Sequence, residues 1–271
     1  MPINDITLAG GMRQNLASLQ LVAALQARTT QRLATGKRVN SAVDDPSAYF
    51  AAQNHMSRAS DLAARKDSMG EAIQTVKAAL QGITGLTTLI DQAKGLAAAA
   101  RGASTADRQT LAAQYGDLLT QIDQLSGDSS YRGTNFLAGD SLTVDFNEDG
   151  SSTLTITGFD ATSGGGLGIG AALNNWASDT DIDAAVADLE GAMSTLRANA
   201  KTLSANLSVV TTRQDFTTNM INTLSTGADL LTAADQNEEG ANMLALQTRQ
   251  QLGVVALSLS SQAQQSILKL F

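Results

Sequence analysis

The chain has 271 residues and a formal net charge of −8, with no cysteine and only two prolines. The lack of cysteine excludes disulfide bonds, zinc–thiolate sites and thiol catalysis, and the acidic balance argues against nucleic-acid binding. Aromatic residues make up 4 % of the sequence, which favours long helices packed through aliphatic side chains over an ordinary α/β core.

The first 33 residues are predicted to form a helix with a broad apolar face. Gly36 ends this helix, and either Asp44 or Asp45 caps the next one, which has Pro46 in its first turn. The start of the chain lacks the basic and then apolar pattern of a secretory signal. If the protein leaves the cytoplasm, we therefore expect a route that reads no cleavable leader.

Two long segments carry apolar residues at the heptad spacing of a coiled coil. They are residues 62–97 and residues 182–231, and only Gln214 and Thr217 interrupt the second apolar seam. A shorter helix with the same spacing, residues 111–125, follows a break and should fold back antiparallel. We therefore expect a mainly α fold in which long antiparallel coiled-coil rods bundle along one axis.

Residues 140–178 have a different composition. Apolar residues alternate on both sides of a turn at residues 147–150, which predicts a β-hairpin. Ser163 and the three glycines that follow it, residues 164–166, predict a flexible surface segment. We expect this part of the chain to be a small excursion at the tip of the helical rods.

The C-terminal segment is predicted to be one helix that begins at Asp235, which caps it together with Glu238. Residues 252–259 are apolar on nearly every side of a helix, and such a helix needs neighbours in several directions. We expect the terminal helices to pair and to bury their remaining apolar surface against other copies of the chain. The predicted polymerisation residues are Leu8, Met12, Leu16, Leu19, Val22, Leu252, Val255, Leu259, Leu268 and Phe271.

The stretch 250–268 contains no charged residue. It is long enough to cross a bilayer, but its glutamines and serines argue against a membrane helix. An uncharged surface would let an unfolded acidic chain slide past without electrostatic trapping, which suggests a channel lining. Alternatively, these side chains satisfy one another between packed helices. The channel-lining candidates are Gln250, Ser261, Gln262, Gln264 and Gln265.

Residues that could carry chemistry do not assemble into a recognisable set. His55 is the only histidine, and it has no second metal ligand beside it. The glycine run 164–170 lacks the lysine of a phosphate-binding loop. The acidic turn at 145–149 lacks the closing glutamate of a calcium loop. We therefore expect no catalytic residue, metal site or cofactor, and a protein that is not an enzyme.

Three segments resemble bacterial flagellin. They read LATGKRVNSAVDDPSAYFAA at 33–52, YRGTNFLAG at 131–139 and ANMLALQTRQQLGVVALSLSSQAQQSILKLF at 241–271. The resemblance covers the whole chain except about 140–178, the region in which larger flagellins insert their outer domains. It implies a structural subunit that polymerises into the flagellar filament for swimming motility.

The resemblance also implies where the protein works and with what. It implies export through the flagellar type III apparatus to an extracellular filament. The implied partners are other flagellin subunits, an export chaperone that holds the C-terminal helix, and hook-associated junction and cap proteins, with no nucleic acid and no membrane. A hook–filament junction protein and a coiled-coil adaptor module are the alternatives. The implied domains are a filament core (1–40 and 233–271), a helical rod domain (41–139 and 179–232) and a variable excursion (140–178).

Overall fold

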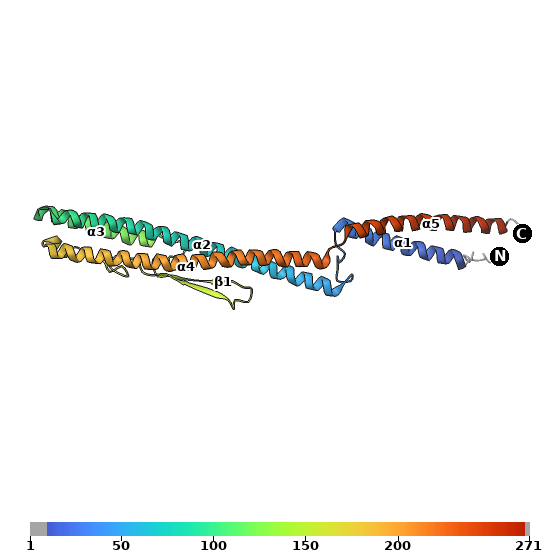
Figure 1. Cartoon of the computed structure of the whole chain (residues 1–271), viewed down its shortest axis with the longest axis horizontal. Helices are drawn as coiled ribbons and strands as arrows, with labels where there is room; N and C mark the ends of the chain where they lie inside the picture. Colours follow the sequence, from blue (N-terminus) through green and yellow to red (C-terminus); the bar gives the residue numbers. More distant parts are fainter. Residues whose placement is uncertain (1–9, 269–271) are drawn as a thin grey trace, which may run out of the picture. The chain divides into compact units, whose positions relative to one another are not determined.

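A computed structural model describes residues 10–268, and its helices and strands are shown in Figure 1. The elements are α1 (Gly10–Thr35), α2 (Pro46–Arg101), α3 (Thr105–Asp128), β1 (Ser141–Asp145), β2 (Thr153–Thr157), the short 3-10 helix η1 (Leu173–Trp176), α4 (Asp179–Thr232) and α5 (Gln236–Leu268). The chain divides into two compact units. The rod unit comprises Arg58–Asn222, and the terminal unit comprises the chain up to Ser57 together with the chain from Thr223 onward.

The rod unit is built from parts of α2 and α4 and the whole of α3, packed around one apolar core. The predicted seam of α2 is confirmed. All six of its main heptad positions are buried, namely Leu62, Met69, Val76, Ile83, Ile90 and Ala97. The helices run antiparallel, since Lys94 of α2 contacts Glu190 of α4 at 3.1 Å and Arg101 pairs with Asp183. Figure 1 shows α3 returning along α2, as predicted.

The two polar interruptions of the α4 seam also lie inside the packed surface. Thr217 is 2 % exposed. The Gln214 side chain donates a hydrogen bond to the backbone carbonyl of Lys66 at 3.3 Å. Gln214 is half-buried, and an amide that finds a hydrogen-bond partner costs little, so the seam continues through the interruption without breaking the rod.

A second buried stripe on α2 was not predicted. It repeats every seven residues and is at most 2 % exposed, and its members are Ala72, Ala79, Leu86, Ala93 and Ala100. Four of these five side chains are alanine, which lets a neighbouring backbone come close. Near the stripe, a β-carbon built on Gly85 would lie 2.8 Å from Cδ2 of Leu125 in α3. α2 therefore needs two apolar stripes because it has two helical neighbours.

The β-hairpin is confirmed, but its predicted place at the tip of the rods is wrong. β1 and β2 pair antiparallel, with Leu142 opposite Ile156. The hairpin lies along the side of the rod unit (Figure 1), where Arg65 of α2 contacts Asp145 at 3.3 Å. The guanidinium of Arg213 in α4 stacks on the Phe146 ring, 5.2 Å from its centroid. Arginines on both long helices thus hold the acidic hairpin against the rod.

The glycine-rich segment also differs from the prediction of a flexible surface loop. The backbone N–H of Ser163 donates to the carboxylate of Asp123 in α3 at 2.6 Å. Leu167 and Ile169, which follow the glycines, are 5 % and 2 % exposed. The segment is fixed on α3 because the apolar residues in its second half are buried.

A short left-handed stretch closes this segment before α4. Asn174, Asn175 and Trp176 have φ angles of 44°, 51° and 56°, which side chains other than glycine seldom adopt. Trp176 is fully buried, with its ring centroid 5.0 Å from that of Tyr115. Burial raises the pKa of Tyr115 to about 12. Burial of the large indole ring offsets the backbone strain.

The helix boundaries follow the predicted caps. Gly36 has a φ of +67° directly after α1, as expected of a C-terminal glycine. Of the two candidate caps for α2, Asp45 is the one that accepts a backbone N–H from the first turn of the helix, that of Ala48 at 3.0 Å. Asp235 caps α5 through the N–H of residue 237 at 2.9 Å.

Candidate polymerisation surface

In the terminal unit, α1 and α5 lie side by side and antiparallel (Figure 1). Near the middle of the pair, a β-carbon built on Gly253 would lie 2.6 Å from Cδ2 of Leu19. At its base, Arg32 of α1 contacts Glu239 of α5. The missing side chain of Gly253 therefore leaves room for Leu19 at this point of the helix pair.

The pair buries little of its own surface. Among the described side chains of α1 and α5, those that are buried are Val22, Thr29, Glu239 and Leu246. Two of these four are polar. Helical stability in proteins comes mainly from the packing of an apolar face rather than from intrinsic propensity. Two helices of this length with so few buried apolar residues have a weak interface with each other.

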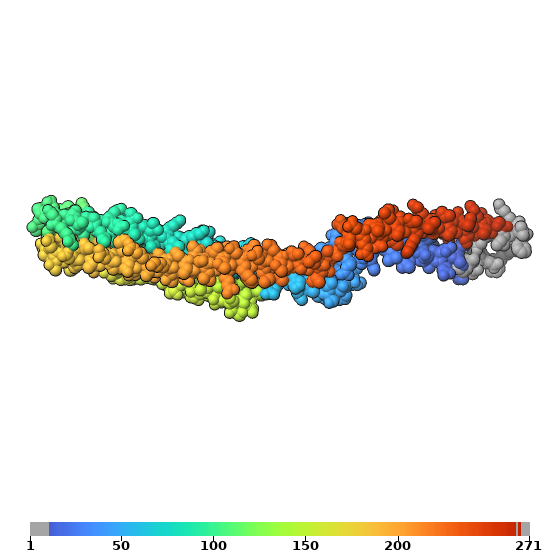
Figure 2. Space-filling view, in the orientation of Figure 1, coloured from blue at the N-terminus to red at the C-terminus, as the bar shows by residue number. Residues whose placement is uncertain are grey.

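Large apolar side chains remain exposed on both helices instead. Leu21 is 61 % exposed on α1, and Leu252, Val255 and Leu259 are 63 %, 64 % and 68 % exposed on α5. On the face shown in Figure 2, no other element of the unit covers α5. Contiguous exposed apolar surface of this kind marks an interaction site.

The seven predicted polymerisation residues whose side chains are described fall into three groups. Leu16, Leu252, Val255 and Leu259 are exposed, Met12 and Leu19 are half-buried, and Val22 is buried within the unit. Leu8 and Phe271 lie outside the described residues, as does the side chain of Leu268 at the end of α5. The structure thus brings the exposed members onto two adjacent helices, while Val22 packs inside their own unit.

The channel-lining candidates lie on α5, from the middle of the helix toward its C-terminal end. Gln262 and Gln265 are exposed, and Gln250 and Ser261 are half-buried. The side chain of Gln264 is not among those that the structure describes. Gln250 also lines a groove of about 440 Å³ together with Gln247, Gln251, Val254 and Val255. Neutral amides and aliphatic side chains thus share this surface. Its assignment to a channel stays a prediction.

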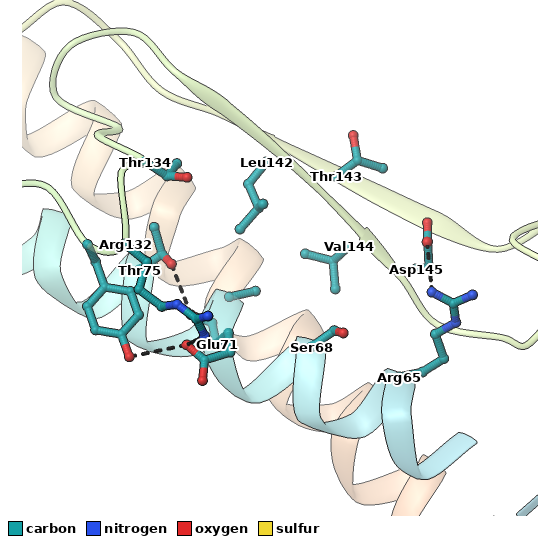
Figure 3. A pocket seen from close by; sticks show the side chains of 12 residues that line it. Arg65, Ser68, Glu71, Thr75, Arg132, Thr134, Leu142, Thr143, Val144 and Asp145 are labelled. Atoms are coloured by element: carbon teal, nitrogen blue, oxygen red, sulfur yellow. Dashed lines mark hydrogen bonds and ion pairs between the residues drawn. The ribbon is translucent and has the colours of Figure 1, made fainter. Parts of the chain in front are cut away.

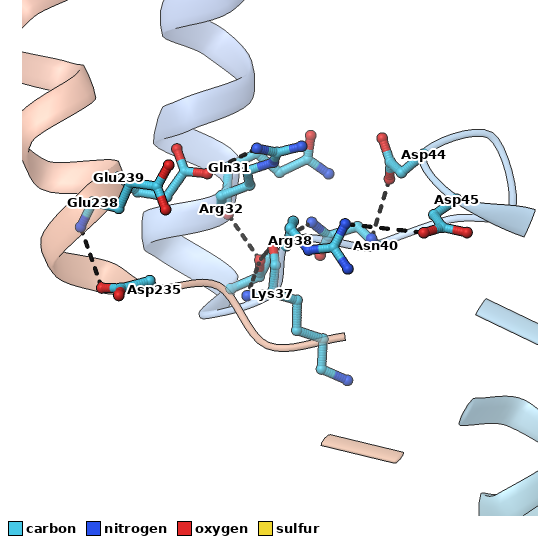
Figure 4. Close-up of polar contacts among 11 residues, drawn as sticks. Gln31, Arg32, Lys37, Arg38, Asn40, Asp44, Asp45, Asp235, Glu238 and Glu239 are labelled. Atoms are coloured by element: carbon cyan, nitrogen blue, oxygen red, sulfur yellow. Dashed lines mark hydrogen bonds and ion pairs between the residues drawn. The ribbon is translucent and has the colours of Figure 1, made fainter. Parts of the chain in front are cut away.

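An ion pair that sequence reasoning missed fastens the base of the α1–α5 pair (Figure 4). Arg32 Nη1 lies 2.8 Å from Glu239 Oε1, and Glu239 is only 7 % exposed. Arg32 is in the last turn of α1 and Glu239 is in the first turn of α5. Each charge therefore sits at the helix end whose dipole favours it.

At this end of the helix pair, residues 36–39, which follow α1, are also hydrogen-bonded to residues 232–234, which precede α5. The N–H groups of Arg38 and Val39 donate to the carbonyl of Thr232 at 2.7 Å and 3.2 Å, and the N–H of Ala234 donates to the carbonyl of Gly36 at 2.9 Å. The opposite charges at two predicted helix ends were visible in the sequence. Their pairing was not, because 207 residues separate them.

A cleft of about 340 Å³ lies in the rod unit between α2 and β1 (Figure 3). At one end, Arg132 contacts Glu71 at 2.9 Å, and the Tyr131 hydroxyl donates to the same carboxylate at 3.2 Å. These hydrogen bonds, that of Arg132 first, lower the pKa of Glu71 below its ordinary value. The Arg65–Asp145 pair lies at the other end. The charges of the cleft neutralise one another and join the hairpin region to α2.

Within residues 10–268, no cluster of three or more histidine, aspartate or glutamate side chains is placed to hold a metal ion. In the same part of the chain, no helix is apolar enough over a sufficient length to cross a membrane.

Comparison with known proteins places this architecture in a family. The bacterial flagellin N-terminal helical region matches residues 3–141. Flagellin FljM of Caulobacter vibrioides is 30 % identical over the full length of both chains. Flagellin FljK of the same organism is 29 % identical, also over both full lengths. A flagellin of Brucella melitensis is 30 % identical over 90 % of each chain. The chain therefore belongs to the bacterial flagellins, the structural subunits of the flagellar filament.

Proposed function

We propose that α1 and α5, within residues 1–40 and 233–271, form the inner core of the filament and carry its main contacts between copies. The observation that carries this proposal is the exposed apolar surface of the α1–α5 pair, with Leu252, Val255 and Leu259 each more than 60 % exposed. Copies stacked along a filament would remove this surface from water. Burial of one such side chain contributes about 1.5–3 kcal/mol, so several per subunit suffice for stable association.

The remaining parts of the chain take the outer positions in this proposal. The rod domain, residues 41–139 and 179–232, forms a shell around the core, and residues 140–178 face outward. The shell would be thin, because the hairpin lies along the rod, where Arg65 holds Asp145. The filament surface is therefore plain compared with that of flagellins that carry inserted outer domains.

The uncharged half of α5 suits a lining for the central channel. Gln262 and Gln265 are exposed and neutral, and the stretch 250–268 holds no charge that could trap a passing acidic chain. Export through the flagellar type III apparatus, an export chaperone on the C-terminal helix, and hook-associated junction and cap proteins complete the proposal. They rest on membership of the family.

Limited trypsin digestion tests the proposed core. Arg13, Arg28 and Arg249 are exposed on α1 and α5, and the weak pairing of these helices should let them open in the monomer. We expect trypsin to trim both ends of the monomer and to spare them in filaments grown from seeds. Equal resistance of both forms would contradict the proposal, as would discrete particles in place of long filaments in electron micrographs.

A further inference from the structure

One edge of the hairpin sheet has no partner strand. Among the described residues, β2 pairs with β1 alone. The N–H of Phe146 donates to the carbonyl of Ser152 at 2.8 Å, and the N–H of Gly158 donates to the carbonyl of Asp140 at 2.7 Å. Hydrogen-bonded pairs alternate along an antiparallel ladder. The backbone groups that point away from β1 are therefore those of Thr153, Thr155 and Thr157.

The β2 edge also lacks the features that usually protect an edge strand. Residues 150–159 contain no charged residue and no proline. The three threonine side chains are exposed, while Leu154 is half-buried and Ile156 is buried against the rod. The nearest charges along the chain, Asp149 and Asp160, lie beyond the strand ends and accept hydrogen bonds within their own loops. Such an edge can accept a further strand through its backbone.

An apolar ridge on α4 runs beside this edge. Val209 and Phe216 are 45 % and 56 % exposed, and they share a helix face because they are seven residues apart. Arg213, between them on that face, stacks on the Phe146 ring of the hairpin. Phe216 also lines a cavity of about 240 Å³ together with Ser152, the residue before β2. We call these two residues the Val209–Phe216 ridge.

A strand added to β2 would cover the ridge. β1 lies next to α2, where Asp145 meets Arg65, so β2 is the strand on the α4 side of the hairpin. The ridge spans about 10 Å of helix, which is close to the length of β2, about 13 Å. The inward aliphatic side chains of an added strand would therefore lie over exposed apolar surface along most of its length.

The sequence of β2 matches a second copy of itself. The strand reads Thr-Leu-Thr-Ile-Thr from Thr153 to Thr157. If two copies pair antiparallel about Thr155, each threonine lies opposite a threonine and each Leu154 lies opposite an Ile156. The chain already uses such pairs between β1 and β2, where Leu142 is opposite Ile156.

The ridge fits the same symmetry. A two-fold axis through the middle of β2 also passes near the middle of the ridge, since the two features lie side by side and have similar lengths. It therefore brings Val209 of one copy opposite Phe216 of the other. The backbone edge and the ridge are thus both self-complementary, as an isologous interface requires.

We propose that two free subunits pair through their β2 edges, in a two-fold dimer that has Thr155 at the centre of a four-stranded sheet. This inference goes beyond the proposed function. Heterologous contacts in a filament relate subunits that point the same way, whereas this two-fold axis relates subunits that point in opposite directions. The dimer is therefore a contact outside the filament, and it separates before a subunit is added.

A charge swap at Thr155 tests the position of the axis. Thr155→Lys alone and Thr155→Glu alone each place like charges opposite one another and should be monomeric in sedimentation experiments. An equimolar mixture of the two should form a heterodimer. Lysine or glutamate at Thr143, exposed on the same face of the neighbouring strand β1, is the matched control and should leave the dimer intact. Dimers of either Thr155 variant alone would overturn the inference, as would a wild-type chain that stays monomeric at every accessible concentration.

A single cysteine traps the contact, because the natural chain has none. Residues that form a hydrogen-bonded antiparallel pair have Cα atoms about 5.5 Å apart, within the range of a disulfide. Thr155→Cys should therefore give a covalent dimer on mild oxidation. Thr143→Cys is the control and should not, since three strand spacings, about 14 Å, would separate the two cysteines. Equal dimer yields from both variants would contradict the proposed register.

Two further measurements separate the ridge and the filament from the edge. Phe216→Ser should raise the dimer dissociation constant by about tenfold, because apolar burial is lost; an unchanged constant would overturn the two-fold register. Thr155→Lys should still add to filament seeds. If it fails to add while the wild-type chain succeeds, the β2 edge belongs to the filament and the inference is overturned. Failure of the wild-type chain to form filaments instead refutes the proposed function.

Discussion

The ion pair between Arg32 and Glu239 gives the sharpest prediction about the terminal unit. Replacing Arg32 with methionine keeps most of the side-chain volume but leaves the Glu239 carboxylate, 7 % exposed, without its partner at 2.8 Å. Removing one member of a fully buried pair costs about 3–5 kcal/mol. The Arg32 side chain is 25 % exposed, so water screens part of the interaction, and we expect about 2–3 kcal/mol.

Hydrogen exchange of the monomer, followed by mass spectrometry, measures this loss where it occurs. A destabilisation of about 2–3 kcal/mol should speed amide exchange in α1 and α5 by roughly 30- to 150-fold, because each 1.4 kcal/mol is a tenfold change in the opening equilibrium. Exchange in α3 of the rod unit should not change. Arg28→Met, at an exposed arginine one turn earlier on α1, is the matched control and should have almost no effect.

A double-mutant cycle then separates the ion pair from simple loss of packing. Arg32→Met combined with Glu239→Gln should recover much of the lost protection, because no buried charge remains unpaired. We expect a coupling energy above about 1.5 kcal/mol. A coupling below about 0.5 kcal/mol, the range of ordinary surface pairs, would refute the reasoning.

Three further predictions concern the rest of the chain. Gly82→Ala should lower the free energy of unfolding in urea by about 1–3 kcal/mol, because the new β-carbon would lie 2.4 Å from the Ser129 hydroxyl. Gly95→Ala on the same helix, with nothing within 4 Å, should instead raise it by up to about 1 kcal/mol; equal effects would contradict the packing of α2. The pKa of Tyr115 is raised to about 12 in the fold, so its stabilising effect is full below about pH 10 and is lost as the pH rises from 10 to 12. Tyr115→Phe should flatten this alkaline decline in a pH series of melting temperatures, and an unchanged slope would argue against burial of the hydroxyl. Lysines at Gln262 and Gln265 should slow filament elongation, measured by fluorescent labelling of growing filaments, if these residues line the channel; unchanged growth would count against that lining.

Local patterns accounted for much of the architecture. The heptad positions that include Met69 and Ile83 are buried as predicted, because a seven-residue apolar repeat on a helix leaves one face that must pack. Gly36 ends α1 and Asp45 caps α2 for reasons that involve only a few neighbouring residues. The hairpin at residues 141–157 likewise follows from strand alternation around a turn.

Features that depend on which surfaces meet were decided by the tertiary structure. The second stripe on α2, which includes Ala79 and Ala93, is composed of residues too small to indicate burial by themselves, and it became a core only because α2 has two neighbours. The hairpin lies along the rod rather than at its tip because Arg65 meets Asp145, 80 residues away in the sequence. In the same way, the register between α1 and α5 alone brings Arg32 to Glu239. The periodic helices, their caps and the apolar character of the chain ends could thus be predicted from the residues alone, since these are short-range properties. Contacts between residues far apart in the sequence could be identified only in the three-dimensional structure, because the identity of a side chain does not specify which distant residue it will meet.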